Sequence, residues 1–151
     1  MKIAIIGKIH EDGENFLRAK NLEIINIENF DEGNLISKLP EVDGIIVRTP
    51  KLTSNVLSNC KRLKIIARHG VGYDNVDINY LNQNNIALAI TGKSNAVSVA
   101  EHVMTMMLTL SKNISASDLL VKSNRFDSKG ELPDFFELYQ KKILILGFGR
   151  I

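Results

Sequence analysis

Residues 64–77 read Lys64-Ile65-Ile66-Ala67-Arg68-His69-Gly70-Val71-Gly72-Tyr73-Asp74-Asn75-Val76-Asp77. The apolar run at 64–67 predicts a short strand, and Asp77 has the residue type and position of a helix N-cap. Two glycines flanking one small residue let successive backbone N–H groups point at one spot, which suits a carboxylate. The alternative is an ordinary loop between a strand and a helix. Either way, the segment predicts a strand, a turn and a helix in sequence.

The same alternation of strand and helix continues on both sides of this segment. The predicted strands are nearly continuous apolar runs, which is typical of strands covered by helices on both faces. We therefore predict an α/β fold with a doubly wound, mostly parallel sheet. The further predicted strands are Lys2–Ile6, Leu22–Ile27, Gly44–Val47 and Ile86–Ile90, and the predicted helices are Glu11–Lys20, Asn34–Leu39, Ser54–Cys60 after a Thr53 cap, and Asp77–Gln83.

Length and composition fit one ordinary soluble domain. The chain has 151 residues, of which 44% are hydrophobic and 24% charged, and its net charge is +2. These values exclude disorder and collagen, and the lone Cys60 excludes a disulfide scaffold and favours a reducing, cytoplasmic location. No apolar run is long enough for a signal peptide or a membrane span. We expect neither nucleic acid nor a membrane as a partner.

The second half of the chain has a different pattern. Ser98–Lys112 predicts a longer helix that is apolar around much of its circumference, and therefore buried on more than one side or placed in a subunit interface. Ile114–Ser123 predicts a second helix, and Asn124–Asp134 a polar linker loop. Lys142–Leu146 predicts a strand that runs into Gly147-Phe148-Gly149. In a dinucleotide-binding fold these glycines allow a tight turn and a close approach to pyrophosphate, although two glycines after a strand also suit a simple turn.

Basic residues gather between Gly44 and Tyr73, where no acidic residue occurs. Arg48 and Arg68 each follow the end of a predicted strand, where ligands bind in open α/β sheets. Arg48 is the better candidate, because a guanidinium at a strand end can bind a carboxylate or phosphate through two hydrogen bonds. We interpret Lys51 as solvated, and Lys61 and Arg62 as complements to a helix C-terminus.

The segment that opens the long helix contains one further candidate. Asn95 can hydrogen-bond a ligand, but Asn95 or Ser98 can equally cap the helix, with Glu101 completing a capping box. We interpret His69 as a loop residue and His10 as a surface residue. The spacing of His, Cys, Asp and Glu predicts no metal site.

Taken together, four motifs resemble one enzyme family over essentially the whole chain. They are Arg48-Thr49-Pro50, residues 68–77, Ser94-Asn95-Ala96-Val97-Ser98-Val99-Ala100-Glu101-His102, and Glu137-Leu138-Tyr139-Gln140-Lys141-Lys142 before the Gly-x-Gly strand. They resemble the D-isomer-specific 2-hydroxyacid dehydrogenases, and most of all D-3-phosphoglycerate dehydrogenases and their hydroxypyruvate or glyoxylate reductase relatives. The chain departs from the family at Gln140, where glycine is usual, which puts only the local loop geometry in doubt.

This resemblance implies a flavodoxin-like substrate-binding (catalytic) domain split by an inserted Rossmann domain that binds NAD, with NADP as the alternative. It implies that Arg48 and Asn95 lie near a small anionic 2-hydroxy or 2-oxo acid, and that the N–H groups of Val71 and Gly72 bind its carboxylate. It implies cofactor contacts for Val99, Gly147 and Gly149, and a homodimer that includes the long helix.

The domain boundaries expected from this reading are residues 1–95 for an incomplete substrate-binding domain, 96–123 for interdomain and dimerisation helices, 124–141 for a linker, and 142–151 for the start of a truncated Rossmann domain. The resemblance puts the catalytic Arg, Glu and His beyond Ile151. We therefore expect the N-terminal portion of an NAD(P)-dependent oxidoreductase, inactive by itself, whose parent transfers hydride at C2 of 3-phosphoglycerate, glycerate or a glyoxylate-type or hydroxypyruvate-type acid. The alternatives are a non-catalytic module that binds small carboxylates and a relative of the formate dehydrogenases.

Overall fold

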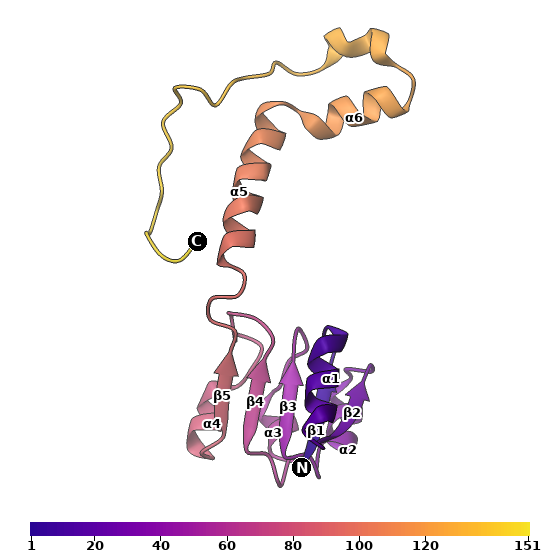
Figure 1. Ribbon diagram of the computed structural model, residues 1–151, viewed down its shortest axis with the longest axis vertical. Coiled ribbons are helices and arrows are strands. Elements are labelled where there is room, and N and C mark those ends of the chain that lie inside the picture. Colours follow the sequence, from indigo (N-terminus) through magenta and orange to yellow (C-terminus); the bar gives the residue numbers. More distant parts are fainter. The chain divides into compact units, whose positions relative to one another are not determined.

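The computed structural model describes all residues from Met1 to Ile151 (Figure 1). The chain divides into two compact units, Met1–Gly92 and Lys93–Ile151. The first unit contains the sheet, and the second contains the long helix and the C-terminal segment.

The first unit is built on one five-stranded sheet in which every neighbouring pair of strands is parallel. Its strand order is β2-β1-β3-β4-β5, which places β1 between β2 and β3. This arrangement confirms the predicted doubly wound α/β sheet. The strands are β1 (Lys2–Ile6), β2 (Glu23–Ile27), β3 (Gly44–Val47), β4 (Ile65–Arg68) and β5 (Ala87–Ile90).

Four helices connect the strands and cover the sheet. Helix α1 lies on one face, whereas α2, α3 and α4 lie on the other (Figure 1). Two predicted caps are confirmed, because the Thr53 hydroxyl accepts a hydrogen bond from the Val56 amide and the Asp77 carboxylate accepts one from the Tyr80 amide. The helices are α1 (Glu11–Ala19), α2 (Glu32–Lys38), α3 (Ser54–Leu57) and α4 (Ile78–Gln83).

The hydrophobic core lies between the sheet and the α2–α4 layer. Alternate residues of the strands point into it, and Ala4, Ile6, Val47 and Ile66 have no exposed surface. Each fully buried Val or Ile side chain among them stabilises the fold by about 1.5–3 kcal/mol relative to an exposed one. This core fixes the strands and therefore fixes the loops at their carboxyl ends.

A buried carboxylate ties the amino end of the sheet together. Asp43 Oδ2 accepts a hydrogen bond from the Lys2 amide at 2.8 Å, and Asp43 Oδ1 forms an ion pair with Arg62 Nη2 at 3.0 Å. Our interpretation that Arg62 interacts with a helix C-terminus is therefore wrong, because its guanidinium forms an ion pair with Asp43, a carboxylate distant in sequence. Lys61 does complement a helix end, since its Nζ donates to the Ser58 carbonyl at 3.2 Å.

The second unit contains α5 (Ala96–Ser111), α6 (Ile114–Lys122) and a 3-10 helix, η1 (Phe126–Glu131). Asn95 occupies the N-cap position of α5 without a side-chain hydrogen bond, so the capping box considered for Glu101 does not form. The 3-10 helix lies within the segment predicted as a linker loop. No helix in either unit combines the length and apolar character that crossing a membrane requires.

Two predictions about the second unit are not met within this chain. Helix α5 is not buried on several sides, since Val97 and Leu110 are each 72% exposed. The strand predicted at Lys142–Leu146 does not form, and Leu146 is 89% exposed. Both features depend on neighbours, because an apolar helix face needs a partner surface and a strand needs an adjacent strand for its hydrogen bonds, and no segment of the chain pairs with residues 142–146.

Candidate functional site

The loops that follow β1, β3 and β4 lie at the same edge of the sheet, because these three strands are adjacent and parallel. Strand pairing aligns Ile6 of β1 with Val47 of β3, and Val47 with Arg68 of β4. The same register continues one residue beyond the strands, because the Arg48 amide donates to the Ile6 carbonyl at 3.4 Å and the His69 amide donates to the Val47 carbonyl at 2.8 Å. Arg48 is therefore placed between the loop after β1 and the loop after β4.

These loops enclose an open hollow of about 500 Å³. Arg48 lies in it as an exposed residue, and its guanidinium forms no ion pair with an acidic side chain of the protein. Sequence reasoning missed the contribution of the loop between β1 and α1. The interpretation of His10 as a surface residue is confirmed, since its side chain is 75% exposed, and its Nδ1 lies 3.2 Å from Asp12 Oδ2. The signal that could have indicated the contribution of this loop is the adjacency of β1 and β3, which belongs to this strand order. The hollow is lined by Lys8, Ile9, His10, Glu11, Arg48 and His69.

The glycine loop after β4, residues 70–72, contains backbone amides that donate no hydrogen bond within the protein. The amides of Val71 and Gly72 donate to no other group of the protein, and both residues are exposed. Gly70 has a φ of +154°, and the Arg68 guanidinium crosses over it to donate to the His69 carbonyl at 3.0 Å. A side chain at position 70 would be strained at this φ and would displace the Arg68 guanidinium, so this path of the loop favours glycine.

A second loop contact holds Arg48 beside the glycine loop. The Asn75 side chain donates to the Pro50 carbonyl at 2.8 Å, and the Leu52 amide donates to the Asn75 carbonyl at 2.8 Å. The Asp77 amide closes the pair by donating to the Leu52 carbonyl at 3.1 Å. The loops after β3 and β4 therefore form one connected structure. Sequence reasoning did not identify this role of Asn75.

The remaining candidate residues belong to the second unit. Asn95 precedes α5, Val99 lies in its first turns, and Gly147 and Gly149 lie in the extended C-terminal segment. Gly147 has a φ of +91°, a conformation that suits glycine. The strand and helix that would form a pyrophosphate cradle are not made by residues 142–151. In neither unit are three or more His, Cys, Asp or Glu side chains grouped to hold a metal ion.

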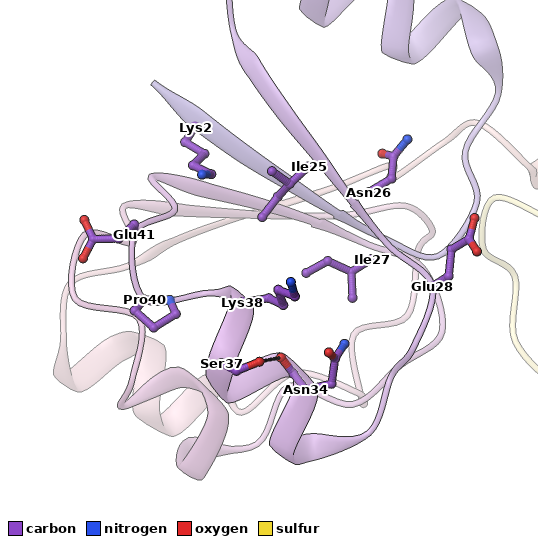
Figure 2. A pocket seen from close by; sticks show the side chains of 10 residues that line it. All are labelled: Lys2, Ile25, Asn26, Ile27, Glu28, Asn34, Ser37, Lys38, Pro40 and Glu41. Atoms are coloured by element: carbon purple, nitrogen blue, oxygen red, sulfur yellow. Dashed lines mark hydrogen bonds between the residues drawn. The ribbon is translucent and has the colours of Figure 1, made fainter.

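A larger hollow of about 720 Å³ lies elsewhere, between β2 and α2 (Figure 2). Its polar side chains have mixed charge, with Lys2 and Lys38 opposed by Glu28 and Glu41. Lys2 pairs with Glu23, and Glu41 pairs with Arg62. This hollow lies beside an edge strand, away from the row of adjacent strand ends, so we take the strand-end hollow and the glycine loop as the candidate site.

Comparison with known proteins identifies the family. Residues 3–142 match the model of the D-isomer specific 2-hydroxyacid dehydrogenase, catalytic domain. The chain is 32% identical over 152 residues to a D-3-phosphoglycerate dehydrogenase of Archaeoglobus fulgidus, and this match covers 100% of the chain and 28% of that protein. The chain therefore spans little more than a quarter of that relative's length.

Solved structures agree in fold. A glyoxylate/hydroxypyruvate reductase of Sinorhizobium meliloti, solved with NADP and malonate, aligns with a TM-score of 0.84 at 25% identity, covering 99% of this chain and 46% of that one. An NAD⁺-bound 3-phosphoglycerate dehydrogenase of Entamoeba histolytica aligns with a TM-score of 0.65 at 30% identity, covering 72% and 38%. By sequence and by fold, the chain belongs to the D-isomer specific 2-hydroxyacid dehydrogenase family.

Proposed function

We propose that these residues form the substrate-binding part of an NAD(P)-dependent oxidoreductase that moves hydride between C2 of a small D-2-hydroxy acid and a nicotinamide. One observation carries the proposal. The amides of Val71 and Gly72 have no partner in the protein, and Arg48, whose guanidinium has no acidic partner, follows β3, the strand that pairs with β4 before the glycine loop. Such a group of donors suits the carboxylate of a 2-hydroxy or 2-oxo acid.

Each residue has a separate task in this proposal. The Val71 and Gly72 amides donate to the substrate carboxylate, Arg48 attracts and holds an anionic part of the same molecule, and Asn95 lies at its nicotinamide end. Fixed donors of this kind orient the substrate and reduce the entropy cost of reaction. The family's catalytic Arg, Glu and His are expected outside residues 1–151, so we assign no proton transfer to the residues described here.

The proposed cofactor is NAD, with NADP as the alternative, and it supplies or accepts the hydride when bound. Val99, Gly147 and Gly149 are its proposed contacts. The φ of Gly147 suits a pyrophosphate turn, but residues 142–151 do not form the cradle themselves. We therefore assign these residues to binding only and derive no chemical step from them.

We further propose a homodimer that uses α5, and a cytoplasmic location. The support for the dimer is the apolar surface that α5 leaves exposed, including Met104, Leu108 and Leu110. The support for the location is the free, buried thiol of Cys60 in a chain without a disulfide. A non-catalytic carboxylate-binding module is not favoured, because the matched relatives are named as dehydrogenases and reductases.

The test is steady-state kinetics on the protein that carries these residues, with glyoxylate, hydroxypyruvate and 3-phosphohydroxypyruvate as oxidants of NADH and NADPH. We expect Arg48→Ala to raise KM about tenfold or more for the anionic substrates, because a charge-assisted contact is lost. Lys51→Ala, which removes a nearby charge outside the site, is the matched control. An unchanged KM in Arg48→Ala for every acid would contradict the role of Arg48, and no turnover of any acid would contradict the function.

A further inference from the structure

Strand β2 is an open edge of the sheet, because it pairs with β1 alone. The Glu23 amide donates to the Met1 carbonyl at 3.0 Å, so the main-chain polar groups of Glu23 face β1. Successive residues of a strand point these groups to opposite sides, and those of Ile24 and Asn26 therefore point away from the sheet. Neither Pro nor Lys, which prevent pairing at many edge strands, occurs in β2. The edge can therefore accept a further strand.

The hollow between β2 and α2 has unpaired charges of opposite sign at its two ends. Glu28 follows the carboxyl end of β2, whereas Lys38 is the last residue of α2, which leads back to the amino end of β3 (Figure 2). Both residues are exposed, and neither forms an ion pair within the chain, unlike Lys2 and Glu41 in the same lining. The half-buried Ile25 of β2 also lines this hollow. An antiparallel strand at this edge fits if it carries the same charges in the reverse direction.

We propose that the partner of this edge is β2 of a second copy of the chain, paired antiparallel about a two-fold axis at Ile25. In this register Ile24 of each copy lies opposite Asn26 of the other. Both residues have outward-pointing groups, so the two pairs form four main-chain hydrogen bonds. The same axis brings Glu28 of each copy to the end of the hollow where α2 of the other copy ends in Lys38. The surface is therefore complementary to itself in hydrogen bonding and in charge.

The opposite edge of the sheet lacks this complementarity. Strand β5 also pairs with one strand only, but the hollow of about 480 Å³ beside it is lined by no charged residue. The β2 contact is also separate from α5, which belongs to the second unit. A chain that associates through both surfaces forms assemblies larger than a dimer.

Disulfide trapping tests the register on the 151-residue chain. The background carries Cys60→Ala, which removes the natural thiol, and Leu110→Glu, which weakens association through α5. Ile25→Cys then places two thiols at the axis, where opposed Cα atoms are about 4.5 Å apart, a distance that a disulfide spans. Under a mild oxidant we expect a covalent dimer to form at least tenfold faster than with Asn26→Cys. Position 26 is more exposed, but its two copies lie opposite residue 24 rather than opposite each other.

Charge reversal tests the end contacts, measured by sedimentation velocity in the Leu110→Glu background. Glu28→Lys or Lys38→Glu alone should raise the dissociation constant about tenfold, because like charges then meet at both ends. An equimolar mixture of these two variants should associate as the background chain does, since each end of the mixed pair again has one charge of each sign. Lys51→Glu, a reversal outside the hollow, should have no effect.

Equal rates of cross-linking at positions 25 and 26 would overturn the inference, and so would a mixture that associates no better than the single variants. A background chain that stays monomeric at millimolar concentration would overturn it as well. These measurements require no substrate, cofactor or hydride transfer. Their outcome is therefore independent of the proposed function.

Discussion

Asp43 shows how a single buried carboxylate makes the stability of the fold depend on pH. The Lys2 amide, which donates to it, lowers the pKa of Asp43 below its ordinary value of 3.8, burial opposes this effect, and Arg62 lowers the pKa further. Because the pKa is lowered in the folded state, the ionised carboxylate stabilises the fold above the unfolded value. That contribution is lost as the pH falls through the folded value, below 3.8.

We therefore expect Asp43→Asn to lower the urea midpoint of unfolding at pH 7, and the difference from wild type to shrink as the pH falls below 4. The exposed Asp134→Asn is the control, and it should leave the midpoint unchanged at both pH values. A difference between wild type and Asp43→Asn that stays constant down to pH 2 would show that the charge of Asp43 contributes nothing.

Cys60 is the second residue whose environment predicts a measurable property. Its side chain is buried, and burial raises the pKa of the thiol from 9.0 to about 11. At pH 8 the thiolate fraction is then about a hundredfold lower than for an unshifted thiol, and only the thiolate reacts. A thiol reagent should label Cys60 slowly in the native chain and rapidly in urea.

A matched control for this experiment is Ser58→Cys in a Cys60→Ala background, since position 58 is exposed two residues away. That thiol should react rapidly without urea. Fast native labelling of Cys60 itself would indicate that the segment after α3 opens frequently, and would contradict the closed packing described for it.

At the scale of elements, the short helices are held in place more by packing than by their own sequences. Gly33 lies in α2, where nothing stands within 4 Å of the position that a Cβ would occupy. Its φ needs no glycine, so the residue only adds backbone entropy to the unfolded chain.

We expect Gly33→Ala to stabilise the protein by about 0.5–1 kcal/mol, measured by urea unfolding. Gly13 in α1 is the comparison, because a Cβ there would lie 3.2 Å from Ile9 Cδ1. Gly13→Ala should therefore gain less than Gly33→Ala. The reverse order would show that the space around these helices differs from that described.

The elements also show where sequence-based prediction succeeds and where it fails. The five strands of the sheet were predicted to within about a residue, because each is a local apolar run, and the proximity of Arg48 to the glycine loop follows from the common edge of a parallel sheet. The strand at Lys142–Leu146 was wrong, because its formation depends on neighbours rather than on its own residues. The Arg62 ion pair with Asp43 and the Asn75 contacts were missed for a related reason, since they join distant residues that no local pattern marks.

At the scale of the whole molecule, the two units differ in how they bury apolar surface. The fully buried hydrophobic side chains all belong to residues 3–81, within the first unit. In the second unit α5 exposes Met104, Leu108 and Leu110, among others. An exposed apolar surface of this kind favours self-association in water.

We expect the chain to self-associate through α5, and Leu110→Glu to raise the dissociation constant at least tenfold in sedimentation velocity, because a charge would be buried in an apolar contact. Gln83→Glu adds the same charge to an exposed position of α4 and should leave association unchanged. If the wild-type chain stays monomeric at millimolar concentration, the proposed role of α5 in the dimer is excluded.

The position of β1 between β2 and β3 has a consequence for synthesis on the ribosome. Ile3 pairs with Ile24 on one side and with Gly44 on the other, so β1, which precedes both of its neighbours in the chain, obtains its second neighbour only after β3 has left the exit tunnel. Until then the apolar side chains of β1 stay open to solvent and to chaperones. During synthesis, therefore, one edge of β1 lacks its partner strand from the time that β1 emerges until β3 has emerged.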